Sequence, residues 1–158
     1  KNIPGIYHTR KSVPLLREFQ LRAVEAGGGK IHRRNLKERV LLKENHKYLA
    51  LASGLSFEGL VEEALRADPL AMIEVENPQE AFKVCSLGAR HIMLDNFSPE
   101  QVAETLKPLK GRVEIEISGG INSENLSRFL FDGVSRLSTS VMTMRAGALD
   151  LSLDWKNS

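Results

Sequence analysis

Three acidic residues recur at one interval in the middle of the chain. Glu74, Asp95 and Glu116 are each 21 residues apart, and each belongs to a short apolar run: IEVEN, MLDNF or EIEISGG. One βα unit of strand, helix and loops has about that length, so we expect the carboxylates at matching heights on successive parallel strands. Carboxylates gathered in this way need nearby lysines, arginines or a metal ion to offset their charge. The alternative is that they are solvated residues at the starts of loops.

Basic residues are concentrated in the first part of the chain. Arg10 and Lys11 stand in HTRKS, His32 and Arg33 follow the AGGGK segment, and Lys43 ends VLLK. Five such groups at strand ends and in one loop indicate a site for a substrate with several negative charges. Arginine suits carboxylates because its planar group donates two parallel hydrogen bonds. Taken singly, each of these residues could equally be an ordinary surface charge.

Two further strand ends have the composition of phosphate-binding loops. In ISGGINSEN, Ser118, Gly119 and Gly120 connect an apolar run to a helix-like stretch, where backbone N–H groups attract phosphate. The same pair of glycines would also serve a plain tight turn. The later segment LSTSVMT offers the hydroxyls of Thr139 and Ser140 at the end of its own apolar run.

The elements that must position these residues alternate between strand and helix. Short apolar runs predict strands over residues 5–9, 40–43, 71–75, 91–94, 113–118 and 134–139. Helical spacing, caps and glycine stops predict helices over 14–26, 57–67, 79–87, 98–106, 123–131 and 144–149. Such alternation indicates parallel strands joined by crossover helices, in a barrel or a doubly wound sheet. In both, ligands gather at the carboxyl ends of the strands.

Residue alternation gives the direction of the acidic side chains. Ile73 and Val75, Ile92 and Leu94, and Ile115 and Ile117 each share one face of a strand, which should pack under the helices. Glu74, Asp95 and Glu116 then point to the opposite face, toward the interior of a barrel.

Composition excludes several classes of function. The 158 residues are 42% hydrophobic and 27% charged, with a net charge of +2, so bulk charge gives no support for nucleic-acid binding. The apolar runs are too short to span a membrane, and the first residues show no signal peptide. Cys85 is the single cysteine, which rules out an internal disulfide framework and suits a reducing compartment. We expect a cytoplasmic protein with no membrane or nucleic-acid partner.

Taken together, these motifs resemble one enzyme family over almost the whole chain. HTRKSVPLLR, EAGGGKIHRRNL, VLLKENH, IEVENPQEA, IMLDNFSPE, EISGGINSENL and LDLSLD follow the order and spacing of quinolinate phosphoribosyltransferase. The resemblance implies a pentosyltransferase of NAD biosynthesis that joins quinolinate to phosphoribosyl diphosphate (PRPP). The products would be nicotinate mononucleotide, carbon dioxide and diphosphate, with Mg²⁺ assisting, in an enzyme that is a homodimer or higher homo-oligomer.

The resemblance also implies roles for individual residues. Those expected to bind quinolinate are Thr9, Arg10, His32, Arg33 and Lys43, and those expected to bind PRPP and its phosphates are Lys11, Glu116, Ser118, Gly119, Gly120, Thr139 and Ser140. Lys43, Glu74 and Asp95 match the catalytic positions, and Glu74 and Asp95 would also hold Mg²⁺ through its diphosphate. Anionic carboxylates suit this chemistry because loss of diphosphate leaves an oxocarbenium-like ribose.

The chain departs from the family pattern in two places. Ser140 and Met144 stand where the family carries a glycine and a histidine, and Thr139, Ser140 and Arg145 could replace that phosphate grip. The family also has an N-terminal α/β domain, which covers the barrel of a partner subunit and lends it an arginine. We therefore expect an incomplete parallel β/α barrel (TIM-like) over residues 1–150. A tail over 151–158 would pack on the absent domain.

Two alternatives to this function remain open. One is a related phosphoribosyltransferase-like protein with another substrate, such as those linked to molybdate transport. Arg10, Arg33 and Lys43 favour a dicarboxylate over that alternative. The other is a catalytically silent binding or scaffold domain.

Overall fold

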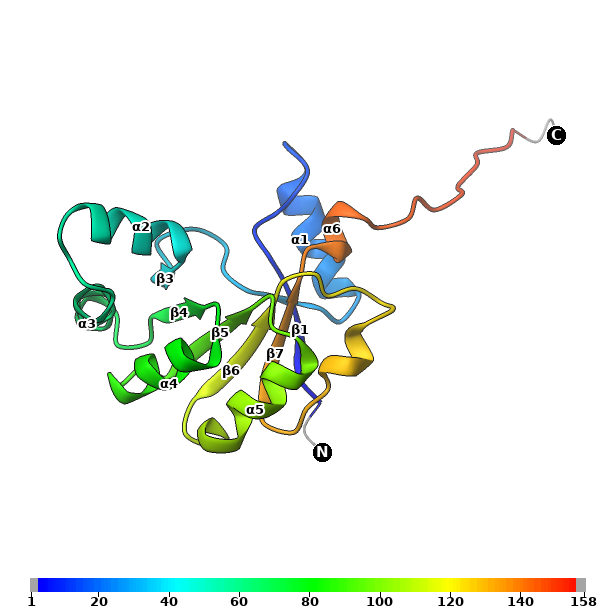
Figure 1. The fold of residues 1–158 in the computed structure, drawn as a ribbon. Coiled ribbons are helices and arrows are strands. Elements are labelled where there is room, and N and C mark those ends of the chain that lie inside the picture. The colour runs from blue at the N-terminus through cyan, green and yellow to red at the C-terminus, as the bar shows by residue number, and fades with distance from the viewer. Residues whose placement is uncertain (1–2, 156–158) are drawn as a thin grey trace.

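Across residues 3–155, which the computed structural model describes, short parallel strands form one curled sheet (Figure 1). They are β1 (Gly5–His8), β2 (Lys30–Ile31), β3 (Leu41–Leu42), β4 (Met72–Val75), β5 (His91–Asp95), β6 (Glu114–Ser118) and β7 (Val134–Thr139). Their order in the sheet is β2-β1-β7-β6-β5-β4-β3, and each neighbouring pair is parallel. The sheet is an open half-barrel, as predicted, and β2 and β3 lie at its edges.

Helical segments connect all successive strands except β2 and β3, and α4 and α5 cover one face of the sheet in Figure 1. The helices are α1 (Arg17–Ala26), α2 (Glu44–Ala52), α3 (Phe57–Ala67), α4 (Pro78–Ser86), α5 (Pro99–Leu109), α6 (Val141–Met144) and the 3₁₀ turn η1 (Leu126–Phe129). Ser56, Asn77 and Ser98 begin α3, α4 and α5 because each side chain accepts a hydrogen bond from a backbone N–H in the first turn. These caps fix the points at which the chain leaves the strand ends.

The hydrophobic core lies between the sheet and these helices. Ile73, Val75, Ile92, Leu94, Ile115 and Ile117 are all fully buried there. Burying a side chain of this size stabilises the fold by about 1.5–3 kcal/mol, so the core fixes which face of each strand points outward. The predicted alternation is therefore confirmed, and the acidic residues of β4, β5 and β6 face the hollow side of the sheet.

The strand register corrects one expectation about the acidic residues. Glu74 pairs with Met93, and Met93 pairs with Glu116, so the two glutamates share one row of the sheet. Asp95 pairs with Ser118, two residues further along its strand. The prediction of matching heights for all three carboxylates is wrong, because equal sequence spacing does not fix the register between neighbouring strands. Asp95 stands above the row of the glutamates, at the rim of the sheet.

The segment after β6 forms less helix than predicted. A helix was expected over 123–131, but only the short turn η1 is present. Asn122 and Asn125 exchange local hydrogen bonds: the Asn125 side chain accepts from the Asn122 N–H, and the Asn122 side chain accepts from the Glu124 and Asn125 N–H groups. Such side-chain bonds compete with the helical pattern and shorten it.

Two elements, α2 and β2, were not predicted, and the last helix was predicted at the wrong residues. The helix α2 follows Lys43 directly, and the His46 ring accepts a hydrogen bond from the Lys43 N–H at its start. Its charged and polar first turn gave no apolar periodicity to detect. The strand β2 has only two residues after a run of glycines. The last helix was expected over 144–149 but lies earlier, at α6.

Beyond α6 the chain leaves the body of the molecule as an extended segment (Figure 1). Leu149, Leu151, Leu153 and Trp155 are each at least 82% exposed along it. The predicted barrel range ends at residue 150, and the predicted tail reaches 158, of which 156–158 lie outside the described residues. That this tail packs on a further domain stays a prediction. Within residues 3–155, the helices are too short or too polar to cross a membrane.

Candidate functional site

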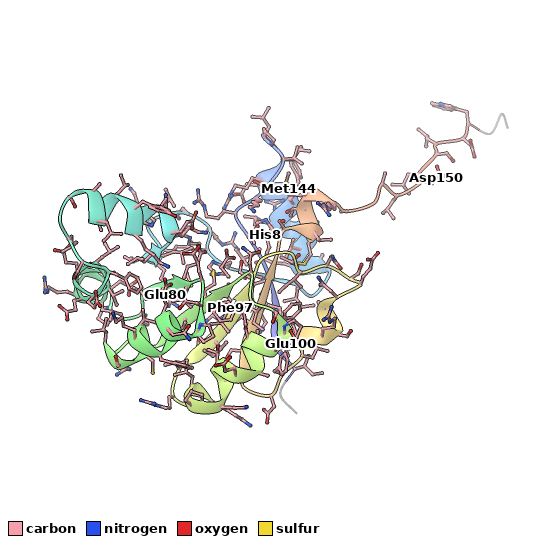
Figure 2. All side chains as sticks on the ribbon, viewed as in Figure 1. His8, Glu80, Phe97, Glu100, Met144 and Asp150 are labelled. Atoms are coloured by element: carbon pink, nitrogen blue, oxygen red, sulfur yellow. The ribbon has the colours of Figure 1, made fainter. Side chains whose placement is uncertain are left out.

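The carboxyl ends of the strands surround a cavity of about 720 Å³. Every strand or its following loop contributes to its wall. Residues of the predicted site that line it are Thr9, Arg10, Lys11, His32, Arg33, Lys43, Glu74, Asp95, Ser118, Gly119, Gly120, Thr139 and Ser140. Figure 2 shows the side chains in the same view as Figure 1, with His8 inside the body and Asp150 far out on the tail. The structure thus gathers residues from both ends of the chain into one polar cavity.

Glu74 and Lys43 form an ion pair on the cavity wall, in which the carboxylate is buried and the lysine is partly exposed. The Lys43 ammonium donates to the Glu74 carboxylate over 2.7 Å, and the Glu74 side chain is only 3% exposed. Burial raises the pKa of Glu74 to about 7, against the lowering effect of Lys43, and the carboxylates of Glu44 and Asp95 add to the increase. A carboxyl group that titrates near neutral pH in a cavity is typical of functional sites.

Asp95 completes the acidic side of the cavity at the end of β5. Its carboxylate accepts a hydrogen bond from the Asn96 side chain over 2.8 Å. Asn96 has a left-handed backbone conformation, with φ of 56°. The turn therefore directs the Asn96 amide back toward the preceding carboxylate, and both residues line the cavity. Glu74 and Asp95 leave carboxylate oxygens on the same wall.

The basic side of the cavity comes from the loops after β1, β2 and β3. Arg10, Lys11, His32, Arg33 and Lys43 all line it. Arg33 donates to the Arg39 carbonyl over 3.0 Å, which fixes its side chain. Burial, and after it the charge of Arg10, lowers the pKa of the Arg33 guanidinium below its usual value. Two guanidiniums that repel each other in this way gain from an anion between them.

The glycine turn after β6 forms a third side. Gly119 has a φ of 92° and Gly120 a φ of 64°, both in the left-handed region. A side chain at Gly119 would collide with Asn96, whose backbone N–H donates to the Ser118 carbonyl over 2.9 Å. Only glycine fits this close approach, so the turn keeps its backbone N–H groups in a cradle suited to an anion.

The end of β7 brings the residues expected to replace the family's phosphate grip to the cavity, and their binding of phosphate stays a prediction. Thr139, Ser140 and Arg145 line the cavity, whereas Met144 is absent from its lining and is half exposed. The Thr139 hydroxyl donates to the Ile121 carbonyl over 2.6 Å, so it joins the glycine turn to β7. Ser140 and Arg145 remain available to a ligand on this side.

Glu116 is the exception among the predicted site residues. Its side chain is fully buried, and it is absent from the cavity wall. Ser138 donates to its carboxylate, and Nε2 atoms of His32 and His91 each lie 2.9 Å from a carboxylate oxygen. Glu116 was expected to contact PRPP directly, and this expectation is corrected. Its carboxylate oxygens already face these three partners, below the residues that line the cavity.

Several lining residues were missed by sequence reasoning. They are Leu41, Glu44, Met93, Asn96, Ile121, Asn122, Ser138 and Val141. Asn96 had a usable signal, because it follows Asp95 directly at a predicted strand end. Glu44 had none, because it lies in the first turn of the unpredicted helix α2.

Glu74 and Asp95 could help to hold a metal ion together with a bound substrate. Among residues 3–155, no three Asp, Glu, His or Cys side chains are grouped to bind a metal by themselves. The oxygen atoms of Glu74 and Asp95 nevertheless suit Mg²⁺, which proteins often hold through one or two carboxylates and substrate phosphates. With cations on one wall and carboxylates on another, the cavity fits a substrate that carries several anionic groups and develops positive charge at one centre.

Comparison with known proteins agrees with this geometry. The family model of the quinolinate phosphoribosyl transferase C-terminal domain matches residues 4–154. A protein of Archaeoglobus fulgidus named "Probable nicotinate-nucleotide pyrophosphorylase (carboxylating)" is 39% identical over 150 residues, which cover 92% of this chain and 57% of that protein. The crystal structure of NadC from Streptococcus pyogenes superposes with a TM-score of 0.85 at 35% identity, covering 96% of this chain and 53% of that one.

A third relative carries a different name. "Putative pyrophosphorylase ModD" of Rhodobacter capsulatus is 35% identical over 119 residues, covering 74% of this chain and 46% of that protein. The chain spans about half the length of the relatives that it matches. Because the family model covers nearly the whole chain, the chain belongs to the quinolinate phosphoribosyl transferase family, in its C-terminal domain.

Proposed function

We propose that the protein to which this chain belongs transfers the phosphoribosyl group of PRPP to quinolinate and decarboxylates the product. The result would be nicotinate mononucleotide, carbon dioxide and diphosphate, for NAD biosynthesis. One observation carries this proposal: Arg10, Arg33 and Lys43 line one cavity with Glu74 and Asp95. The basic residues suit a substrate with two carboxylates, and the acidic residues suit a sugar that becomes cationic during the reaction.

The basic wall would bind quinolinate through its two ring carboxylates. Arg10 and Arg33 are close enough for the charge of one to lower the pKa of the other, so a dicarboxylate between them relieves their repulsion. Thr9 and His32 lie on the same wall. Fixing the ring in this way would bring its nitrogen to the ribose, and such positioning can supply a large part of the rate.

The acidic wall would stabilise the reacting sugar. As the bond from ribose C1′ to diphosphate breaks, the leaving group takes the electron pair and the ribose gains positive charge. Ionised Glu74 and Asp95 face that charge. Because the pKa of Glu74 is raised to about 7, mainly by burial, the approach of a cation favours loss of its proton at the moment when the charge is needed.

Attack by the ring nitrogen on C1′ forms the new bond and leaves the ring cationic. The neighbouring carboxylate then departs as carbon dioxide, its bonding electron pair stays on the ring carbon, and that carbon takes a proton from water. Lys43 bridges the two walls, since it lines the cavity and contacts Glu74. Bound Mg²⁺ would neutralise charge on the diphosphate, held with the help of Glu74 and Asp95.

The phosphates of PRPP would lie on the third side of the cavity. Lys11, Ser118, Gly119 and Gly120 supply a cation and a turn with left-handed glycines, and Thr139 and Ser140 flank it. The proposal includes a cytoplasmic location and a homodimer or higher homo-oligomer, as the family resemblance implies. It also includes a further domain that receives the tail over residues 151–158.

The test is an assay of the full natural protein containing this chain. Diphosphate release should depend on quinolinate, and Arg33→Ala should lower apparent quinolinate affinity by about tenfold or more, since charged hydrogen bonds contribute about 1.5–3 kcal/mol. Arg90→Ala is the matched control, because Arg90 is exposed and lies outside the cavity wall. Release that is independent of quinolinate, or equal loss in both variants, would contradict the proposal.

The similarity to ModD supports a second candidate, a pyrophosphorylase that acts on a different acceptor. The same assay separates the two, because PRPP cleavage would then occur with another anionic acceptor and not with quinolinate. A silent binding domain is the remaining alternative. It predicts retained binding of quinolinate or phosphate with no turnover by the full protein.

A further inference from the structure

Glu116 is a buried carboxylate with partners from three distant parts of the chain. It stands on β6 and is fully buried. His32 follows β2, His91 begins β5 and Ser138 belongs to β7, and all three reach its two oxygens. The proposed function does not use this group, although His32 also lines the cavity.

The carboxylate is ionised across the physiological range. Burial by itself would raise the pKa of Glu116, but the contacts with His32 and His91, and the hydroxyl of Ser138, outweigh it and lower the pKa to about 2. A buried carboxylate of this kind needs a hydrogen on every nitrogen that faces it. A hydrogen on Nε2 of each histidine meets this need: His91 Nε2 forms a hydrogen bond with one oxygen, and His32 Nε2 lies 2.9 Å from the other oxygen as an ion-pair contact without the alignment of a hydrogen bond.

That requirement fixes the ring of His32. With Nε2 facing Glu116 at 2.9 Å, the other ring nitrogen, Nδ1, is left for a ligand. The Tyr7 ring meets the His32 ring edge-on, with centroids 6.5 Å apart, and the backbone N–H of His32 donates to the His8 carbonyl. These contacts hold the His32 backbone and place Tyr7 against its ring.

The charged groups around the contact between Glu116 and His32 differ from one side to the other. On the cavity side, Arg10 and Arg33 are cationic and repel a charged His32. His8 is also buried, and burial lowers its pKa, which favours its neutral form, so it adds no charge beside His32. Beyond His91, Glu114 accepts from Arg136 over 2.8 Å and lies 3.8 Å from His91 Nδ1. Glu116 is thus the one carboxylate in contact with His32 among residues 3–155.

We infer that Glu116 is a positioning residue, which holds His32 with Nε2–H turned inward so that Nδ1 can bind a substrate carboxylate as a charged donor. To donate from Nδ1, His32 must take up a proton, and the anionic Glu116 stabilises the resulting imidazolium. This is the logic by which a buried carboxylate orients a histidine in many active sites. The identity of the substrate carboxylate rests on the proposed function, whereas the state of the ring does not.

The experiment compares Glu116→Gln with the wild type in the full protein. Glutamine keeps the shape and removes the charge, and Glu114→Gln is the matched control on the same strand, where the side chain is half exposed. The first readout is the ¹⁵N NMR spectrum of the His32 ring without ligand. We expect the neutral wild-type ring to carry its proton on Nε2.

The second readout is calorimetric binding of quinolinate between pH 5.5 and 8. Glu116→Gln should weaken binding by about tenfold, because a charge-assisted hydrogen bond is lost. In a His32→Asn background the same change should have little further effect, whereas in an Arg33→Ala background its effect should persist. Glu116→Asp should recover part of the loss.

Two results would overturn the inference. One is a neutral wild-type His32 ring with its proton on Nδ1. The other is a Glu116→Gln defect of equal size in the His32→Asn background, which indicates a structural role. If the wild type binds no quinolinate, the proposed function fails, and the NMR readout still decides the role of Glu116.

Discussion

Glu74 and Glu116 lie in the same row of the sheet, on either side of Met93, and their surroundings have opposite effects. Glu74 is buried with one cation, Lys43, and burial raises its pKa to about 7. Glu116 is buried more deeply, but contacts with His32, His91 and Ser138 lower its pKa to about 2. Burial therefore does not decide the charge of a carboxylate; the number of donors that face it does.

The different pKa values suit Glu74 and Glu116 to different tasks. A carboxyl group poised near neutral pH on a cavity wall can change its charge when a cation approaches, which suits a direct part in chemistry. A carboxylate that stays ionised below the floor holds other residues in place. Changes at Glu116, Glu74 and Ser138 test this difference, with expected effects that decrease from the first to the last.

The largest effect should come from Glu116→Ala. This change leaves two buried histidines and the Ser138 hydroxyl without their shared acceptor, and breaking a buried network of this kind costs about 3–5 kcal/mol. Urea unfolding of the variant measures the loss. Glu114→Ala, which removes a half-exposed ion pair with Arg136, should cost less than about 1 kcal/mol. Equal losses would show that Glu116 is not the centre of a network.

Glu74→Gln should reduce activity rather than stability. The variant loses the negative charge proposed to face the reacting ribose, and we expect turnover to fall by at least about a hundredfold, in the range typical of lost electrostatic stabilisation. Steady-state kinetics of the full protein, with quinolinate and PRPP saturating, measures it. Glu76→Gln is the control, because Glu76 is exposed and pairs with Lys47. A Glu74→Gln enzyme with near-normal turnover would remove Glu74 from the proposed chemistry.

Glu74 should also leave a signature in the pH dependence of stability. Its folded pKa is about 7 and its ordinary value is 4.5, so the folded state binds the extra proton between those values. The free energy of unfolding should therefore fall as pH rises from about 4.5 to 7, by on the order of 2 kcal/mol. Glu74→Gln should remove this slope. Glu116 should act in the opposite sense, since its stabilising effect is lost only as pH falls from 4.5 toward 2.

The smallest effect should come from Ser138→Ala. This variant removes one of three donors to Glu116 and leaves both histidine contacts, so it should cost about 1 kcal/mol in thermal or urea unfolding. A loss as large as that of Glu116→Ala would mean that the hydroxyl, and not the histidines, keeps the carboxylate ionised.

Much of the fold could be predicted because it depends on local patterns. The Ser56, Asn77 and Ser98 caps and the apolar alternation of the central strands are properties of neighbouring residues. Most strand ends, and with them most of the cavity lining, followed from those patterns. The helix α2 and the shortened turn η1 did not, because polar side chains near Lys43 and at Asn122 determine them through hydrogen bonds that leave no apolar period.

The sequence by itself determined that Glu74, Asp95 and Glu116 face the hollow side of a parallel sheet, because strand alternation and apolar burial dictate it. Only the tertiary structure decided that Asp95 stands higher at the rim and that Glu116 lies out of reach beneath the floor. The physical reason is that register and electrostatic surroundings are set between strands. His32, His91 and Ser138 meet Glu116 from positions 84, 25 and 22 residues away in the chain, and no local pattern encodes that meeting.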